Sequence, residues 1–232
     1  IEDAAHAPGA TWNGRYLGTI GAAGCFSFFS NKNITTAEGG MLVTDDPDIA
    51  AQARLLRSHG MTTSSYDRAQ GHATRYDIRQ VGYNYRLDDI RAAIGLVQLG
   101  KLGEDLRKRR FLAKRYRRLL VQLPEVTVPF SGKTEASSNY IFPIVLNENC
   151  PISRDEFRNR LEKEWGIQTS VHYPAVHRFT QYADDKAYLP VTDYIVNHEL
   201  TLPLYYGMTE EQVDYVYLGI RAILLDYKEK IS

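Results

Sequence analysis

The chain has 232 residues, of which 44% are apolar and 24% charged, and its formal net charge at pH 7 is zero. This composition suits a folded protein of one large or two small domains, and neutrality argues against binding nucleic acid or membranes by charge. No apolar run approaches the roughly 18 residues that can span a bilayer. The two cysteines, Cys25 and Cys150, lie far apart without metal-ligand spacing, so we expect buried thiols in the reducing cytoplasm.

Short apolar runs and helix-capping signals define the elements expected in the first part of the chain. Two apolar runs of strand length flank a polar turn; they are residues 21–29 and 40–44. Asp46 followed by Pro47 is typical of a helix start, and this helix should end before Gly60. Residues 61–81 show no sustained period and predict an irregular loop.

A long helical stretch follows, beginning at Asp88 or Asp89. Glycine disfavours the helix interior, so we expect Gly100 and Gly103 to interrupt this stretch. A domain change is placed at that interruption. The two domains that this predicts are residues 1–102 and residues 103–232.

Residues 106–123 predict a helix with two distinct faces. At about 100° per residue one face is apolar; it carries Leu112, Tyr116, Leu119, Leu120 and Leu123. The other face is basic; it carries Lys108, Arg110, Lys114, Arg115, Arg117 and Arg118. A basic face can attract nucleic acid or a nucleotide diphosphate, but in a chain of zero net charge we expect a solvated face.

The remainder predicts an α+β unit. Ser153 and Thr209 each open a capping box, and each therefore marks the start of a helix. The first of these helices should end at Trp165, because Gly166 follows it. Strands are expected in two further segments; they are residues 139–146 and residues 167–173.

Lys32 lies in a polar turn between an apolar run and a pair of glycines. A lysine beside an apolar strand loses part of its charge through desolvation, which makes its amine a usable nucleophile. Asp3 stands at a predicted strand end, and Ser27 lies in the strand before the lysine. Taken singly, these residues are a surface lysine, a helix-capping aspartate and a strand serine. Together they predict a site for pyridoxal phosphate (PLP), which needs a lysine, an acid at its pyridine nitrogen and donors for its phosphate.

Four stretches together resemble the DegT/StrS group of sugar aminotransferases, which are fold-type I PLP enzymes acting mostly on keto-sugars attached to nucleotides. They are Glu2-Asp3-Ala4-Ala5-His6, Phe26-Ser27-Phe28-Phe29 through Lys32, Glu38-Gly39-Gly40 and Gly82-Tyr83-Asn84-Tyr85-Arg86. The resemblance implies an α/β fold, with the C-terminal part of the large α/β/α PLP-binding domain over residues 1–102 and a smaller α+β domain over residues 103–232. It also implies that about 150 residues precede Ile1 in a complete member, so we expect the C-terminal part of an enzyme.

The resemblance implies a cofactor role for five residues. Asp3 would pair with the pyridine nitrogen of PLP, and His6 would meet its phenolic oxygen or ring if this segment turns helical. Ser27 would donate to the phosphate, and Lys32 would bind the cofactor covalently and then act as the base that moves the substrate proton. Asn84 would reach the phosphate in the neighbouring subunit, which implies a homodimer with shared active sites.

Four further residues are expected on the substrate side. Arg86 belongs to the same motif as Asn84, and His172, Tyr173 and His177 lie in a segment that resembles the substrate-side loop of the group. A metal site there is not expected, because the two histidines lack a third ligand at suitable spacing.

One position departs from the group. Ala37 stands where glycine is common, and alanine disfavours a positive φ, so we expect a small local adjustment.

The function implied is transfer of an amino group from an amino acid, with glutamate expected as donor, to a nucleotide-linked keto-sugar. The product would be an amino sugar for cell-surface glycans or secondary metabolites. One alternative is a PLP-dependent sugar dehydratase, in which histidine replaces the lysine, and the presence of Lys32 counts against it. The other is a non-catalytic regulatory or interaction protein on the same fold, against which Asp3, Ser27 and Lys32 all count.

Overall fold

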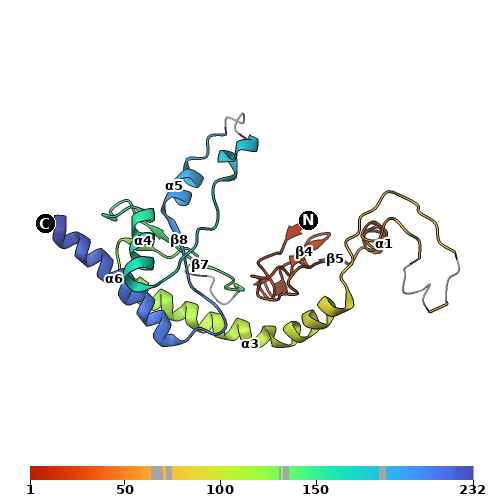
Figure 1. Cartoon of the computed structure of the whole chain (residues 1–232), viewed down its shortest axis with the longest axis horizontal. Coiled ribbons are helices and arrows are strands. Elements are labelled where there is room, and N and C mark those ends of the chain that lie inside the picture. The colour runs from red at the N-terminus through yellow and green to blue at the C-terminus, as the bar shows by residue number, and fades with distance from the viewer. Residues whose placement is uncertain (64–69, 72–74, 131, 133–135, 183–186, 232) are drawn as a thin grey trace. The chain divides into compact units, whose positions relative to one another are not determined.

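The structure is a computed structural model with a mixed α/β fold. It describes residues 1–63, 70–71, 75–130, 132, 136–182 and 187–231 (Figure 1). The chain divides into two compact units. The first unit consists of Ile1–Asp105 together with Ala136–Ser138, and the second of Leu106–Glu135 together with Asn139–Ser232.

A three-stranded sheet holds the beginning of the first unit. Strand β1 (Glu2–Asp3) pairs in parallel with β4 (Gly24–Ser27), and β4 pairs antiparallel with β5 (Gly40–Val43). The strands expected over residues 21–29 and 40–44 are therefore confirmed, in shortened form.

A hairpin that the sequence analysis did not predict follows β1. Its strands are β2 (Thr11–Trp12) and β3 (Arg15–Tyr16), which pair antiparallel. Asn13 and Gly14 form the turn with φ of 49° and 77°. Positive φ at both central residues is the geometry for which Asn-Gly is favoured in two-residue hairpins.

Helix α1 (Pro47–Leu56) begins where its capping signals predicted. The Asp46 carboxylate accepts hydrogen bonds from the backbone N–H groups of the first turn, at 2.8 and 3.1 Å. Gly60 has a φ of 71° and donates its N–H to the Leu55 carbonyl, which ends the helix as expected. The predicted loop over residues 61–81 lies partly outside the described residues, and its described part contains an isolated bridge between Met61 and Ile78.

Helix α3 (Asp89–Leu120) is continuous, so the interruption expected at Gly100 and Gly103 is wrong (Figure 1). Each glycine costs about 1 kcal/mol relative to alanine, which the surrounding strong helix formers outweigh. Asp88 caps the helix by accepting the Arg91 N–H at 2.9 Å. The boundary between the two units falls within this helix, after Asp105.

The second unit contains an antiparallel sheet in the order β6-β7-β8. Its strands are β6 (Val126–Thr127), β7 (Phe142–Leu146) and β8 (Glu199–Leu202). Its other elements are α4 (Arg154–Trp165), η1 (Val176–Arg178), η2 (Thr180–Tyr182), α5 (Pro190–His198) and α6 (Glu210–Ile231).

Both capping predictions of this unit are confirmed. The Ser153 hydroxyl accepts the Glu156 N–H, and Gly166 ends α4 in the left-handed region. Thr209 and Gln212 cap each other reciprocally, each side chain accepting the backbone N–H of the other.

The strand expected over residues 167–173 is mostly wrong. Only Ser170 pairs with the sheet, through an isolated antiparallel bridge to Thr201. Two residues further on, the His172 N–H donates to the Glu199 carboxylate at 3.0 Å instead of to a strand carbonyl. Because the His172 N–H is bonded to the Glu199 carboxylate, the backbone does not continue to pair with the sheet beyond Ser170.

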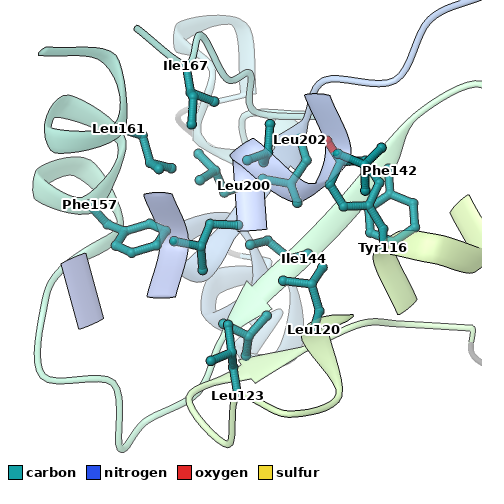
Figure 2. Packing of buried hydrophobic residues seen from close by; sticks show 14 of the residues in the cluster. Tyr116, Leu120, Leu123, Phe142, Ile144, Phe157, Leu161, Ile167, Leu200 and Leu202 are labelled. Carbon is teal, nitrogen blue, oxygen red and sulfur yellow. The ribbon is translucent and has the colours of Figure 1, made fainter. Parts of the chain in front are cut away.

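The hydrophobic core of the second unit lies between its sheet and the helices α3, α4 and α6 (Figure 2). The predicted apolar face of residues 106–123 is confirmed, since Leu112, Tyr116 and Leu120 are fully buried. The Tyr116 ring stacks on Phe142 at 4.8 Å between centroids, and its hydroxyl donates to the Pro203 carbonyl at 3.0 Å. A buried phenol that keeps a hydrogen bond avoids the cost of an unsatisfied polar group.

The basic face of the same helix is only partly solvated. Lys114 and Arg118 are exposed as expected. Arg115 instead forms ion pairs with Glu210 and Asp214 of α6, and Arg117 donates to the Pro129 carbonyl at 2.9 Å. These arginines join elements of the second unit, so their pattern reflects folding rather than nucleic-acid binding.

Two expectations on the environment of the chain have different outcomes. Cys25 is exposed and Cys150 half-buried, so the expectation of two buried thiols is wrong. Of the four residues of β4 only Gly24 is buried, so a position in this strand does not by itself bury Cys25. In the part of the chain that the structure describes, no helix is long and apolar enough to cross a membrane.

Candidate active site

Asp3 and Ser27 lie at the same edge of the first sheet. Asp3 is the last residue of β1, and Ser27 is the last residue of β4. The two strands are parallel, with Asp3 opposite Cys25. Since the carboxyl ends of parallel strands meet at one edge, this is where the two predicted cofactor residues come together.

Lys32 lies in a turn that leaves this edge and returns to it. Its backbone N–H donates to the Phe29 carbonyl at 3.0 Å, while Phe28 bonds across the turn to Thr36 and Gly39 at 2.9 Å each. A side chain at Gly39 would place its Cβ 2.4 Å from the Thr36 hydroxyl, so glycine is required for this closure. The turn therefore fixes the backbone of Lys32 just beyond the end of β4.

The environment of the Lys32 amine differs from that of a surface lysine. Burial lowers the pKa of Lys32 below its ordinary value, and the negative charge of Asp3 partly opposes this shift. The first effect confirms the desolvation expected from the apolar strand. The second indicates that Asp3 is near enough to act on the amine through its charge.

The segment after Asp3 forms turns rather than the helix considered for His6. Asp3 Oδ1 accepts the Ala5 N–H at 3.1 Å, which orients the carboxylate, and Ala7 donates to the Ala4 carbonyl at 2.9 Å. His6 lies in this turn, half-buried.

Glu2 anchors the strand from the other side. Its carboxylate accepts three backbone N–H groups at 2.6–2.8 Å, from Gly18, Ile20 and Gly21. These hydrogen bonds lower the pKa of Glu2 below its ordinary value. Strand β1, and with it Asp3, is thereby held against the loop that leads to β4.

Two residues that the sequence analysis missed join the turns of Lys32 and His6. Asn33 is 9% exposed and donates its amide to the Ser138 carbonyl at 3.2 Å. The Ser138 hydroxyl donates to the His6 carbonyl at 2.5 Å. A contact across more than 100 residues leaves no local pattern, so no signal in the sequence could have found it.

The motif that contains Asn84 closes against the end of helix α1. Tyr83 donates to the Leu56 carbonyl at 2.6 Å and accepts the His59 N–H at 2.8 Å. A Cβ at Gly82 would lie 2.3 Å from the backbone nitrogen of Gly60, so the approach of these two segments requires glycine at position 82.

Asn84 and Arg86 are both exposed on this motif. Asn84 forms an isolated antiparallel bridge with Ser58, and Arg86 donates to the Ser58 hydroxyl at 3.3 Å. Backbone pairing therefore fixes Asn84, while its side chain makes no hydrogen bond to the described residues.

His172, Tyr173 and His177 belong to the second unit. His172 Nδ1 lies 2.9 Å from the Thr201 hydroxyl, and its ring meets that of Tyr173 edge-on at 4.8 Å between centroids. His177 Nε2 lies 3.0 Å from Asp193 Oδ1. Burial opposes ionisation of Asp193, but hydrogen bonds from Arg178 and His177 keep its pKa below the ordinary value.

The aminotransferase family described as DegT/DnrJ/EryC1/StrS has a model that matches residues 1–221. The chain belongs to this family. The match covers the Lys32 turn, the Asn84 motif and the His172 loop alike.

Individual relatives agree with this assignment. The chain is 36% identical over 231 residues to the uncharacterized protein MJ1066 of Methanocaldococcus jannaschii, covering 97% of this chain and 59% of that protein. Among solved structures, PseC of Helicobacter pylori, an aminotransferase of pseudoaminic acid biosynthesis, has 28% identity and a TM-score of 0.87, with 97% of this chain and 59% of that chain covered. The putative sugar aminotransferase Spr1654 of Streptococcus pneumoniae, in its PMP form, has 29% identity and a TM-score of 0.86, with 97% and 58% covered. The chain thus spans slightly more than half the length of these family members.

The structure also bears on the local adjustment expected at Ala37. Ala37 has a φ of 65°, in the left-handed region, and its N–H donates to the Thr35 hydroxyl at 3.0 Å. The adjustment expected there therefore does not avoid a positive φ. A non-glycine residue in this conformation is strained by roughly 1–2 kcal/mol.

We expect Ala37→Gly to stabilise the complete protein by about 0.5–1 kcal/mol, because the relieved strain exceeds the entropy that glycine loses on folding. The measurement is the urea midpoint at unchanged slope. Ala51→Gly, at an exposed position within helix α1, is the matched control and should destabilise by about 1 kcal/mol. Equal destabilisation by both changes would show that Ala37 is not strained.

Proposed function

We propose that the protein containing this chain is a PLP-dependent aminotransferase that transfers an amino group, with glutamate as donor, to a nucleotide-linked keto-sugar. The observation that carries the proposal is Lys32, whose pKa is lowered by burial at the sheet edge where Asp3 and Ser27 meet. Membership of the family supports it, as do neighbours solved in PLP and PMP forms. The product would be an amino sugar for cell-surface glycans or secondary metabolites.

The side chains at this edge fit PLP. Lys32 offers an amine for the covalent link, and Asp3 offers a carboxylate whose second oxygen has no hydrogen-bond partner among the described residues. Ser27 accepts the Phe29 N–H at 3.3 Å, which leaves the hydroxyl hydrogen to donate to a phosphate. When bound, PLP supplies an electron sink for the charge that develops beside the substrate nitrogen.

The residues of the chain would then have separate tasks. Asp3 keeps the pyridine nitrogen protonated by placing a negative charge beside it. The Lys32 amine, once released from the cofactor, would take the proton from the substrate carbon and deliver it to C4′ of the cofactor, and a lowered pKa increases the share of neutral amine that can accept this proton. His6 would meet the cofactor from the turn that Ser138 fixes. Arg86, His172, Tyr173 and His177 are assigned to the substrate side.

The two alternatives are less well supported. A sugar dehydratase of this fold would have histidine in place of Lys32. A regulatory or interaction protein has no need for a lysine of lowered pKa that senses the charge of an aspartate. We also assign the protein to the cytoplasm, where cysteine thiols such as that of Cys25 are kept reduced.

Borohydride reduction of the complete PLP-loaded protein should fix the cofactor covalently to Lys32 alone, as found by mass spectrometry of the digested protein. Adding glutamate before the reduction should prevent the labelling, because the cofactor then leaves the lysine. A label on any other lysine would refute the site.

A second experiment tests the sugar class. Transamination rates are measured with a panel of keto-sugars, each offered both free and linked to a nucleotide. Equal rates for the two forms would refute the nucleotide requirement.

We further propose that the active unit is a symmetric homodimer in which Asn84 reaches the partner's cofactor phosphate. The first unit exposes large apolar side chains on the first part of helix α3, including Ile90 (77% exposed) and Leu96 (72%). Apolar side chains gathered on one exposed helix are typical of a protein interface. Asn84 precedes this helix and is itself exposed, and a two-fold axis would place equivalent residues at both sites.

Mixing two inactive homodimers tests this arrangement. Lys32→Ala and Asn84→Ala subunits should together form heterodimers with one doubly damaged and one intact site, restoring up to about half of the activity per heterodimer. The matched control mixes Lys32→Ala with Asp3→Asn, which damages both sites and should restore nothing. The test requires that the Asn84→Ala homodimer is itself impaired and that heterodimers have been shown to form. If activity is then not restored, Asn84 does not serve the partner's site.

A further inference from the structure

The turn that carries Lys32 is buried on its C-terminal side. Lys32 itself is half-buried, whereas Asn33 and Thr36 are 9% and 0% exposed. Backbone hydrogen bonds close the turn onto the end of β4, and the Asn33 side chain adds a contact with a distant part of the chain. Its amide donates to the Ser138 carbonyl at 3.2 Å, across 105 positions.

The orientation of the Asn33 amide follows from this contact. A carbonyl oxygen only accepts, so Nδ2 faces Ser138 and Oδ1 points away from it. Oδ1 is buried and has no hydrogen-bond partner among the described residues. Burying an unsatisfied acceptor costs free energy. The side chain therefore makes its contact with Ser138 at the expense of its own oxygen.

Residues 136–138 are bonded to the first unit at three points. Ala136 accepts the Thr11 N–H at 2.8 Å, and the Ser138 carbonyl accepts the Asn33 amide. The Ser138 hydroxyl donates to the His6 carbonyl at 2.5 Å, across 132 positions. Ser138 is 5% exposed, so bulk water does not readily replace a bond that is lost there. The segment belongs to the same compact unit as the two turns that it joins.

We propose that Ser138 is a positioning residue for the reaction, because it joins the turn after Asp3 to the turn of Lys32 and so keeps the carboxylate and the amine in register. It touches neither group, and acts through the His6 carbonyl on one side and Asn33 on the other. The catalytic roles of Asp3 and Lys32 rest on the proposed function, whereas the joining of the two turns rests on the hydrogen bonds alone. A misplacement of about 1 Å at a reacting group can slow a reaction by roughly 10²-fold.

Hydrogen exchange of the complete protein without cofactor tests the joining of the turns. Ser138→Ala removes the bond to His6, and the Lys32 amide, which donates to the Phe29 carbonyl, should then exchange about tenfold faster. The Ser138 hydroxyl does not touch the Lys32 turn, so this effect has to pass through the segment. Mass spectrometry of the fragmented peptide 28–36 measures it. An exchange rate equal to that of the wild type would overturn the proposal.

A matched control removes the same kind of hydrogen bond at the other end of the first sheet. The Thr44 hydroxyl donates to the Ala22 carbonyl at 2.6 Å, where β5 ends and before β4 begins, whereas Ser27 ends β4 at the cofactor edge. Thr44→Ala should leave the exchange of Lys32 unchanged. Ser138→Thr keeps the hydroxyl and should restore the wild-type exchange. Equal acceleration by Thr44→Ala would overturn the proposal, because the effect would then be a general loss of stability.

Steady-state kinetics of the complete PLP-loaded enzyme test the consequence for the reaction. Ser138→Ala should lower kcat about tenfold with KM for glutamate and the keto-sugar changed less than about twofold, since the chemical step rather than substrate binding is affected. Ser138→Thr should recover most of kcat, and Thr44→Ala should not lower it. An unchanged kcat in folded Ser138→Ala would overturn the positioning role. If Ser138→Ala does not fold, Ser138→Cys takes its place, because its thiol keeps the shape and is only a weak donor.

The two measurements keep this inference distinguishable from the proposed function. An inactive wild-type enzyme whose Lys32 exchange responds to Ser138→Ala would refute the proposed function and still support the joining of the two turns. An active wild-type enzyme without that response would overturn the role of Ser138 alone.

Discussion

Replacing Lys32 by alanine should lower the transamination rate of the complete protein by roughly 10⁴-fold or more. The change removes both the group that binds the cofactor covalently and the base that moves the substrate proton, and general bases alone contribute about 10²–10⁴-fold. Steady-state rates with a keto-sugar nucleotide and glutamate measure the effect. Bound cofactor should persist without a covalent link, as absorbance after gel filtration would show.

Two controls make the Lys32 result specific. Lys163→Ala removes an exposed lysine of helix α4 and should leave the rate unchanged. Adding a small primary amine to Lys32→Ala should recover a fraction of the activity, because the amine can take over the proton transfer. A Lys32→Ala enzyme with near-normal turnover would remove the basis of the whole proposal.

Asp3→Asn should lower kcat by about 10²–10³-fold, which is the usual size of a lost preorganised electrostatic contact. The amide keeps the shape of the carboxylate but cannot hold a proton on the pyridine nitrogen by its charge. Single-turnover rates with glutamate would locate the loss in the proton-transfer half of the reaction. Asp45→Asn, which changes an exposed acid of the same unit, is the matched control and should have no effect.

The pKa of Lys32 separates two explanations for the Asp3→Asn result. The charge of Asp3 raises the pKa of Lys32, so its removal should lower that pKa further and leave more amine neutral. The lysine would then be at least as reactive as before, and a slower reaction could not be blamed on it. Unchanged turnover would refute the role given to Asp3.

The features that the sequence predicted correctly are those encoded by neighbouring residues. Asp46, Ser153 and Thr209 cap helices through hydrogen bonds that span two or three residues, so their patterns are visible without the fold. The lowered pKa of Lys32 followed from an adjacent apolar strand in the same way. The Asn13-Gly14 hairpin has an equally local signal and could have been predicted from it.

The failed predictions involve forces from distant parts of the chain. The exception is helix α3, which passes through Gly100 and Gly103 because the strong helix formers beside them outweigh the low helix propensity of glycine. The chain leaves the sheet after Ser170 because a carboxylate from β8, almost 30 residues later, binds the His172 N–H. The hydrogen bond from Asn33 to Ser138 joins residues that are 105 positions apart, so no local sequence pattern encodes it.

The three residues Ala136–Ser138, which return to the first unit, have a consequence for how members of this family can exchange parts by recombination. Ala136 accepts the Thr11 N–H at 2.8 Å, and Ser138 bonds to both Asn33 and His6. A genetic crossover after Asp105 would therefore import, along with a foreign second unit, the residues that hold the turns of Lys32 and His6. A donor without a hydroxyl at the place of Ser138 would lose the hydrogen bond to the His6 carbonyl, whereas the bonds from Asn33 and Thr11 go to backbone carbonyls and do not depend on the imported side chains.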